Sequence, residues 1–220
     1  MTEIGRVLRS KEAAKASYNR MSKGYDLLTG KSEKKYEDIG LEFLNTRAGE
    51  TVLEIGFGTG KALASLARLV QPGGRVYGLD ISEGMLVVAE KRLRKAGLSD
   101  WVELKCGDAV ALPYPEESFN AIFLSFTLEL FDTPEIPLVL EECRRVLRPD
   151  GRMCIVAMSK KGEPNLMTRL YDWAHDKIPN YVDCRPIQVQ EMMETAGFRT
   201  TKTRLLRMWG LPVEIVLVMK

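Results

Sequence analysis

A glycine-rich turn between an apolar strand and an amphipathic helix constrains this chain more than any other feature. The segment Thr51-Val-Leu-Glu-Ile-Gly-Phe-Gly-Thr-Gly-Lys61 places three alternate glycines after a short apolar run. Leu63, Leu66, Ala67 and Val70 then follow at the spacing of one helical face. Glycines at such a turn let backbone N–H groups approach a ligand closely, because no Cβ stands in the way. The segment predicts a cofactor site, and the alternative is a tight turn that binds nothing.

The spacing of the glycines argues against a dinucleotide site. The dinucleotide fingerprint is Gly-x-Gly-x-x-Gly, whereas Gly56, Gly58 and Gly60 give Gly-x-Gly-x-Gly. An acidic residue, Glu54, stands two positions before the first glycine.

Two aspartates follow the next two strands. The strand from Arg75 ends in Asp80, about twenty residues after the last glycine, where a nucleotide site of this type places the carboxylate that accepts hydrogen bonds from ribose hydroxyls. Asp80 is alternatively a helix cap, but Ser82 is better placed for that role, in a helix that Gly97 ends. A third strand over 101–105 leads to Asp108, which is a candidate partner for an adenine amino group or else an ordinary turn residue.

Strands and helices alternate through most of the chain. A fourth strand is expected over 119–123, a helix beginning with the cap Thr133 and with Pro134, and a fifth strand over 153–158 after a turn at 148–151. A helix over 186–196 and two strands over 200–208 and 213–219 complete the chain, and the two strands form a hairpin. This order predicts an α/β fold with a doubly wound, seven-stranded, mostly parallel sheet and a C-terminal antiparallel hairpin strand. Ligands bind such sheets at the carboxyl ends of the strands, where Gly56, Asp80, Asp108 and Ser125 fall.

The domain organisation is expected to have two parts. We expect residues 1–48 to form a helical cap with helices over 11–21 and 32–45. Residues 49–220 are expected to form the main domain. The segment 159–185 is longer than an ordinary strand–helix connection, so we expect a lid over the substrate, or else an amphipathic helix packed on the sheet. Tyr18 and Tyr25 lie seven residues apart, so they fall on one side of a helix if the helix continues that far. They are either site residues or tyrosines that pack at a helix end.

Composition excludes several classes of protein. The net charge of +2 and the lack of a basic tract argue against nucleic acid as a partner. No apolar run reaches transmembrane length and no signal pattern is present, so we expect a cytoplasmic protein. Four separated cysteines and a single histidine argue against a zinc site, and buried free thiols are expected instead.

In their order along the chain, these motifs resemble those of class I S-adenosylmethionine-dependent methyltransferases. More narrowly, Tyr18-Asn19, Tyr25-Asp26 and the run from Gly107 to Ile122 are similar to the ubiquinone and menaquinone biosynthesis C-methyltransferases. Two departures stand out. Asn19 and Asn120 replace aspartates that are usual in that branch, and residues 126–131 read Phe-Thr-Leu-Glu-Leu-Phe where its members typically show Phe-Gly-Leu-Arg-Asn.

The resemblance implies S-adenosylmethionine as the cofactor, with S-adenosylhomocysteine as its product. Glu54 and the first two glycines would surround its methionine part, Asp80 its ribose and Asp108 its adenine. The full set of expected cofactor-binding residues is Glu54, Gly56, Phe57, Gly58, Gly60, Asp80, Ile81, Met85, Gly107, Asp108, Ala109 and Ser125.

The implied activity is methyl transfer to a small, partly apolar, quinone-precursor-like acceptor, by a monomer or homodimer. Orientation supplies most of what a protein adds to such a transfer. If a proton must leave the acceptor, Glu129 and His175 are the candidate bases and Tyr18 and Tyr25 the orienting hydroxyls. The alternatives are N- or O-methylation of a phospholipid or small metabolite, a nicotinamide-dependent oxidoreductase, and a cofactor-binding regulatory or partner subunit without turnover.

Overall fold

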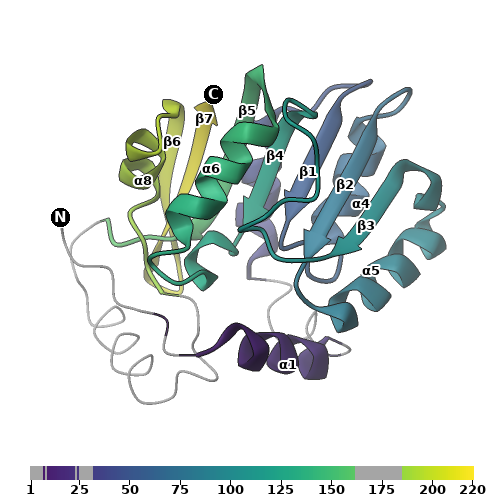
Figure 1. Cartoon of the computed structure of the whole chain (residues 1–220), viewed down its shortest axis with the longest axis horizontal. Helices are drawn as coiled ribbons and strands as arrows, with labels where there is room; N and C mark the ends of the chain where they lie inside the picture. Colours follow the sequence, from purple (N-terminus) through teal and green to yellow (C-terminus); the bar gives the residue numbers. More distant parts are fainter. Residues whose placement is uncertain (1–6, 8, 23, 25–31, 162–184) are drawn as a thin grey trace.

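A seven-stranded sheet with the strand order β3-β2-β1-β4-β5-β7-β6 runs through the computed structural model of this chain (Figure 1). The structure describes residues 7, 9–22, 24, 32–161 and 185–220. The strands are β1 (Thr51–Ile55), β2 (Arg75–Asp80), β3 (Val102–Cys106), β4 (Phe119–Ser125), β5 (Leu147–Met158), β6 (Arg199–Met208) and β7 (Leu211–Met219). Strands β1 to β5 run parallel to one another, and β7 is antiparallel to both β5 and β6. The predicted α/β architecture is confirmed.

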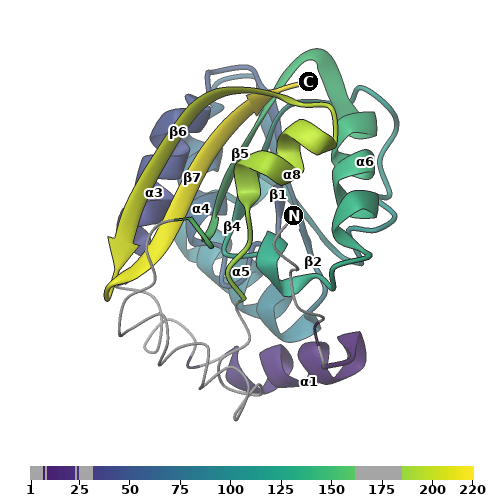
Figure 2. The same ribbon diagram turned by 90° about the vertical axis from the view of Figure 1, so that its left-hand side faces the viewer.

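Helices cover both faces of the sheet (Figure 2). One face packs against α3 (Lys34–Leu44), α4 (Lys61–Leu69) and α5 (Glu83–Ala96), and the other against α6 (Ile136–Val146) and α8 (Val189–Thr195). Strand β1 shows the alternation that divides the two cores, because Val52 belongs to the first and Leu53 and Ile55 to the second. Glu54 therefore points to the same side as Val52, toward the layer of α3 and α4.

Local capping signals place the ends of α5 where the sequence predicts them. The Ser82 hydroxyl accepts a hydrogen bond from the Met85 N–H, and Gly97 ends the helix in the left-handed conformation. The final hairpin turns through Trp209 and Gly210, both with positive φ, as a two-residue turn between twisted strands requires.

The start of α6 differs from the prediction. The helix begins at Ile136 after Glu135, with Pro137 in its first turn, and neither Thr133 nor Pro134 opens it. The Asp132 carboxylate accepts the Thr133 N–H, and the Asp132 carbonyl accepts the N–H groups of Glu135 and Ile136. These bonds fold residues 132–135 into a turn, so the helix starts two residues later than expected, at Ile136 rather than Pro134.

Two further boundaries are displaced by pairing between strands. β5 begins at Leu147, which pairs with Phe119 ahead of a register shift, although a turn was expected there. The helix expected from residue 186 begins at Val189, because Ile187 forms a bridge with Ser159 beside the sheet. Short 3₁₀ turns, Ser99–Trp101 and Leu128–Leu130, complete the described elements.

The cysteines agree only in part with the prediction of buried thiols. Cys143 and Cys154 are buried and free, and burial raises the pKa of the Cys143 thiol to about 12. Cys106 is exposed, since it ends β3 at the rim of the sheet, and its thiol donates to the Ile81 carbonyl. Cys184 lies outside the described residues.

Helix α1 (Lys11–Met21) lies across the end of the sheet at which the parallel strands finish (Figure 1). None of its residues is buried, although Tyr18 packs against the core, and several polar contacts attach the helix. Lys15 pairs with Glu83 at 2.5 Å, and the Asn19 side-chain oxygen accepts from the Ser82 hydroxyl and the Gly84 N–H. The hydrogen bond from Lys15 lowers the pKa of Glu83 to about 2.

Across the described ranges, no helix combines the length and the apolar character that crossing a lipid bilayer requires.

Candidate functional site

A cavity of about 470 Å³ opens at the carboxyl ends of the parallel strands, beneath α1. Its walls come from the ends of β1, β2, β3 and β4, from the segment after β4, and from α1 and α3. The described lining residues are Val7, Arg9, Ser10, Lys11, Ala14, Tyr18, Glu33, Glu37, Glu54, Ile55, Gly56, Phe57, Gly58, Thr59, Lys61, Leu79, Asp80, Ile81, Met85, Gly107, Asp108, Ala109, Ser125, Phe126, Thr127, Leu130, Phe131, Asp132 and Glu135.

The three glycines of the turn have different surroundings. All have positive φ, but a Cβ on Gly56 would lie 2.3 Å from the Thr127 hydroxyl, and one on Gly60 would lie 2.9 Å from the Ala89 Cβ. A Cβ on Gly58 would meet nothing within 4 Å. Gly56 and Gly58 line the cavity, whereas Gly60 packs against α5. Open space beside the backbone is therefore found at Gly58.

Asp80 holds the glycine turn and the start of α5 together. Its carboxylate accepts the Gly58 N–H at 2.8 Å and the Ser82 N–H at 2.9 Å. Burial raises its pKa, and the hydrogen bonds from these backbone groups and from Ile81 oppose that rise. The carboxylate lies on the cavity wall, at the end of β2, as the sequence predicts.

Glu54 is the most deeply buried carboxylate among the described residues of the cavity wall. The residue is only 3% exposed, and its Oε2 has no hydrogen-bond partner among the described residues. Burial, together with the nearby charges of Glu37 and Asp80, raises its pKa well above the usual value. Such a group favours the arrival of a hydrogen-bond donor or a cation.

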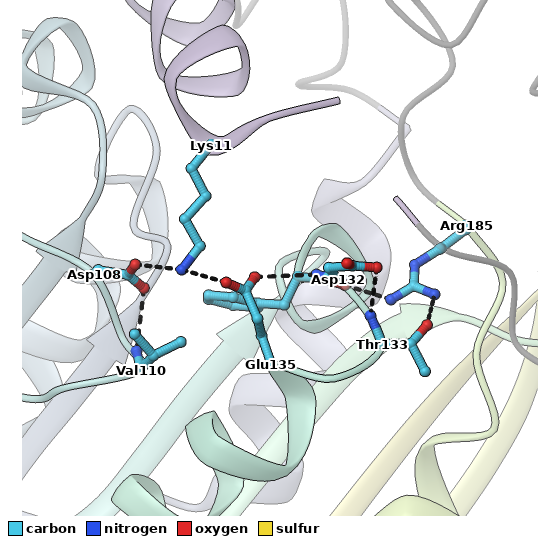
Figure 3. Close-up of polar contacts among 8 residues, drawn as sticks. Lys11, Asp108, Val110, Asp132, Thr133, Glu135 and Arg185 are labelled. Carbon is cyan, nitrogen blue, oxygen red and sulfur yellow. Dashed lines mark hydrogen bonds and ion pairs between the residues drawn. The ribbon is translucent and has the colours of Figure 1, made fainter. Parts of the chain in front are cut away.

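Asp108 is engaged by a residue from the N-terminal region. The Lys11 ammonium lies 2.5 Å from its Oδ2 and 2.6 Å from Oε1 of Glu135 (Figure 3). Burial lowers the pKa of Lys11, but the hydrogen bonds to the two carboxylates outweigh it and raise the pKa. The other oxygen of Asp108 accepts the Val110 N–H. Lys11 thus bridges the two sides of the cavity mouth.

The segment 131–135 connects the Lys11 bridge to Arg185. Asp132 accepts the N–H groups of Val7 and Thr133, and its own N–H donates to Glu135. On the far side, the Arg185 guanidinium donates to the Thr133 hydroxyl and to the Phe131 carbonyl (Figure 3). Three regions far apart in the sequence therefore meet along one rim.

An apolar wall faces the carboxylates. Phe126, Leu130 and Phe131 line this part of the cavity, and Tyr18 lines it from α1. Phe126 has φ of +49°, an unfavourable conformation for a bulky residue, and its N–H is held by the Val156 carbonyl. Its ring meets that of Tyr36 edge to face, with 6.4 Å between the centroids.

Eleven of the twelve residues expected to bind a cofactor line the cavity, and Gly60 does not. Tyr18 also lies on the wall. Glu129 is not among the described lining residues, since it is fully buried between β5 and the turn at 128–130, where its Oε1 accepts the Met158 N–H. This contact favours a structural role over proton transfer. Tyr25, His175 and most of the expected lid lie outside the described residues.

Sequence reasoning missed Lys11, Glu37 and Thr127 as cavity residues. Lys11 and Glu37 belong to surface-like, mixed-charge helices, and nothing near Lys11 in the sequence indicates its partner Asp108, 97 residues away. Thr127 could have been found from its place two residues after Ser125, at the carboxyl end of a central strand.

Comparison with known proteins gives this cavity a context. The sequence profile of a family described as "methyltransferase domain" matches residues 52–151, which include the glycine turn, Asp80 and Asp108. Residues 52–151 therefore resemble a methyltransferase domain.

Two curated proteins to which the chain is similar are named as methyltransferases of quinone biosynthesis. The chain is 39% identical over 121 residues to the demethylmenaquinone methyltransferase of Lactobacillus johnsonii, a match that covers 55% of this chain and 49% of that protein. It is 36% identical over 157 residues to the ubiquinone/menaquinone biosynthesis C-methyltransferase of Pseudomonas fluorescens, covering 71% and 59% of the two proteins. The matches thus span about half to three fifths of the length of these relatives.

A crystal structure of a SAM dependent methyltransferase from Aquifex aeolicus shares the fold. Its TM-score against this chain is 0.67 with 25% sequence identity, and the match covers 91% of this chain and 97% of that one.

The residues of the cavity fit S-adenosylmethionine, the cofactor that the sequence motifs predict. A ribose offers two hydroxyl donors, which suit a buried carboxylate such as Asp80. The unpaired oxygen of Glu54 suits a cationic donor, and the open side of Gly58 leaves room for a ligand beside the backbone. These features lie on one cavity wall, so one ligand can meet all of them.

Proposed function

We propose that this protein transfers a methyl group from S-adenosylmethionine to a carbon of a small, partly apolar acceptor of the quinone-precursor type. The observation that carries the proposal is the juxtaposition, in one cavity, of a polar wall formed by Glu54, Gly58 and Asp80 and an apolar wall formed by Phe126, Leu130 and Phe131. The names of the sequence relatives support the quinone class of acceptor.

The cofactor-binding roles follow the chemistry of each side chain. Glu54 would accept a hydrogen bond from the ammonium of the methionine part, and Asp80 would accept from the ribose hydroxyls. Asp108 would accept from the adenine amino group beside Ala109 and Ile81, which requires it to exchange its contact with Lys11. S-adenosylmethionine, when bound, supplies a methyl group on a positively charged sulfur.

The rest of the work is orientation and exclusion of water. The apolar wall would hold an aromatic acceptor against the polar one, and α1 contributes Lys11, Ala14 and Tyr18 to the cavity wall. Fixing two reactants in this way can lower a barrier by about 7–11 kcal/mol in favourable cases. Tyr18 is the described hydroxyl best placed to orient the acceptor, since it lines the cavity from α1.

The test uses methyl-labelled S-adenosylmethionine with demethylmenaquinone in detergent, and in parallel with a cell extract. We expect label in the organic phase with the quinone precursor, and none with Asp80→Ala. Label in the aqueous phase alone would refute the quinone-type acceptor and favour a polar metabolite. Cofactor binding without transfer to any acceptor would support a regulatory or partner subunit instead.

The residues 126–131 supply a reason to test more than one acceptor. This segment departs from the sequence of the quinone enzymes, and it forms much of the apolar wall. A second candidate is therefore another small aromatic acceptor with the same cofactor. A panel of phenols and quinone precursors of increasing side-chain length would separate the two.

A further inference from the structure

The turn between β6 and β7 carries a tryptophan that its backbone disfavours. Trp209 has φ of +52° in the two-residue turn that Met208 and Leu211 close. Asn, Asp or Gly suits such a position, because a positive φ is unfavourable for a bulky side chain. The indole is 66% exposed and belongs to neither core cluster, so packing does not offset this cost. A local rule broken without a gain in packing is typical of a functional position.

Strand β6, which leads into this turn, is strongly basic. Residues 199–213 contain no acidic residue and four exposed cationic ones, which are Arg199, Lys202, Arg204 and Arg207. The first acidic residue after this stretch, Glu214, is only 1% exposed and pairs with Lys161 at 2.7 Å. Because β6 is the last strand of the sheet, its outer edge presents this positive charge to the solvent.

Exposed apolar side chains accompany these cations. Leu205 is 48% exposed, and Trp209 follows it at the turn. A hollow of about 320 Å³ in the same part of the hairpin has the described lining residues Lys161, Leu205, Leu206, Arg207 and Pro212. Charge on an edge strand is an ordinary guard against pairing with another chain, but exposed leucine and tryptophan side chains work against that purpose. The combination therefore indicates a surface that binds a partner with both anionic and apolar parts.

The turn lies at the same end of the sheet as the cavity. Met158, the last residue of β5, pairs with Val213 near the start of β7, so the turn is beside the carboxyl end of β5. Figure 1 shows the turn and α1 toward the same end of the sheet. The Tyr36 hydroxyl donates to the Arg207 carbonyl, and the Tyr36 ring meets that of Phe126 on the cavity wall. One side chain thus connects the base of the turn to the apolar wall.

A lipid bilayer with anionic headgroups matches each of these features. Anionic headgroups attract lysine and arginine side chains, tryptophan favours the boundary between headgroups and acyl chains, and leucine favours the apolar layer. An acceptor of the proposed quinone-precursor type is partly apolar, so it enters such a bilayer. Nucleic acid matches the charge and the indole but leaves the exposed Leu205 unexplained.

We propose that a hairpin patch formed by Arg204, Leu205, Arg207 and Trp209 docks this protein on an anionic lipid surface. Docking brings the cavity to the phase that holds an apolar acceptor. The choice of a lipid partner rests on the proposed function, since that function supplies the apolar acceptor. The attachment is reversible, because a few basic and apolar side chains give much less binding than a lipid anchor or a membrane span.

Co-sedimentation of the full chain with vesicles tests the docking directly. The vesicles contain phosphatidylcholine, either alone or mixed with phosphatidylglycerol. Trp209→Asn removes the indole and suits the positive φ of the turn, and a second variant combines Arg204→Gln with Arg207→Gln. Urea unfolding checks that each variant is folded.

Matched controls make the same kinds of change away from the hairpin. Val87→Asn replaces an apolar residue of α5 that is 61% exposed. A double control combines Arg75→Gln with Arg94→Gln, which are exposed arginines at the start of β2 and in the last turn of α5. The double control lowers the net charge as much as the double variant of the patch does.

We expect the unmodified protein to bind vesicles that contain phosphatidylglycerol at least about tenfold more tightly than phosphatidylcholine alone. Each variant of the hairpin patch should weaken binding about tenfold, and each control less than about threefold. No binding to the anionic vesicles, or an equal loss in the arginine control, would overturn the hairpin patch. Binding to a single-stranded oligonucleotide but not to vesicles would overturn it in favour of nucleic acid.

Transfer assays separate the docking from the proposed function. With a long-chain quinone precursor in anionic vesicles, Trp209→Asn should lower the rate about tenfold, whereas the rate with a short-chain, water-soluble analogue should be unchanged. Equal losses with the two acceptors would contradict docking. Failure of the unmodified protein to methylate either acceptor would refute the proposed function, while the vesicle measurement, which needs no acceptor, would still decide the docking.

Discussion

Gly58 and Gly60 look equivalent in the sequence, but replacing each by alanine should have opposite consequences. Gly60 has φ of +78°, and a Cβ there would lie 2.9 Å from the Ala89 Cβ and 3.2 Å from its Cα. Gly58 has φ of +51°, and a Cβ there would meet no atom within 4 Å, yet it would enter the cavity wall. Gly60→Ala should therefore lose stability, and Gly58→Ala should lose binding.

The magnitudes follow from two separate costs. A left-handed backbone costs a non-glycine residue about 1–2 kcal/mol, and both variants bear this cost. Gly60→Ala adds the overlap with α5, which overpacking data put at about 1–3 kcal/mol. We thus expect a loss of about 2–5 kcal/mol for Gly60→Ala and about 1–2 kcal/mol for Gly58→Ala.

Urea unfolding with an unchanged slope measures the loss of stability, and calorimetric titration with S-adenosylmethionine measures the loss of binding. Gly58→Ala should weaken binding by at least about tenfold, because the new methyl group occupies space beside the ligand. Folded Gly60→Ala should bind within about threefold of the unmodified protein. A Gly60→Ala protein of normal stability with lost binding would refute the assignment of the two glycines.

Three further substitutions test other parts of the structure. Asp80→Ala should abolish detectable cofactor binding in a calorimetric titration while the protein stays folded, since the two lost backbone contacts are worth only about 1–3 kcal/mol; undiminished binding would exclude the ribose role. Burial raises the pKa of Glu50, but hydrogen bonds from Arg152 and the Arg47 N–H outweigh it, so the pKa is lowered and the resulting stability is lost as the pH falls through that lowered value. Arg152→Met should therefore cost about 1–3 kcal/mol in urea unfolding at pH 7 and clearly less at pH 3.5, and an equal cost at both pH values would contradict this account. Asn19→Ala should remove three hydrogen bonds to the start of α5 and speed proteolysis within α1, a change that should be absent if α1 is held elsewhere.

Local signals were enough to place most of the fold. The limits of α1, the Ser82 cap and the Gly97 stop depend on side chains next to the backbone groups that they satisfy. The order of strands and helices then leaves few topologies, and the hairpin at Trp209 and Gly210 fixes the antiparallel end of the sheet.

Side-chain contacts, near and far in the sequence, account for what the sequence did not reveal. At the start of α6, the Asp132 side chain accepts the N–H of its neighbour Thr133 and delays the helix. In the core, Glu129, a candidate base on the sequence alone, accepts the Met158 N–H. The contact between Lys11 and Asp108 joins residues 97 positions apart, and no local pattern contains that information.

Because ion pairs attach α1 to the rest of the protein, the rates at which a ligand enters and leaves the cavity should depend on ionic strength. The ion pairs of Lys11 and Lys15 are about one third or more exposed on most of their members, so dissolved salt weakens them, with a screening length of about 8 Å at physiological ionic strength. Glu54 and Asp80 on the polar wall of the cavity are buried, so salt affects their interactions far less. Rising salt should therefore accelerate ligand entry and exit together, while the equilibrium affinity, set mainly by these two buried carboxylates, changes much less.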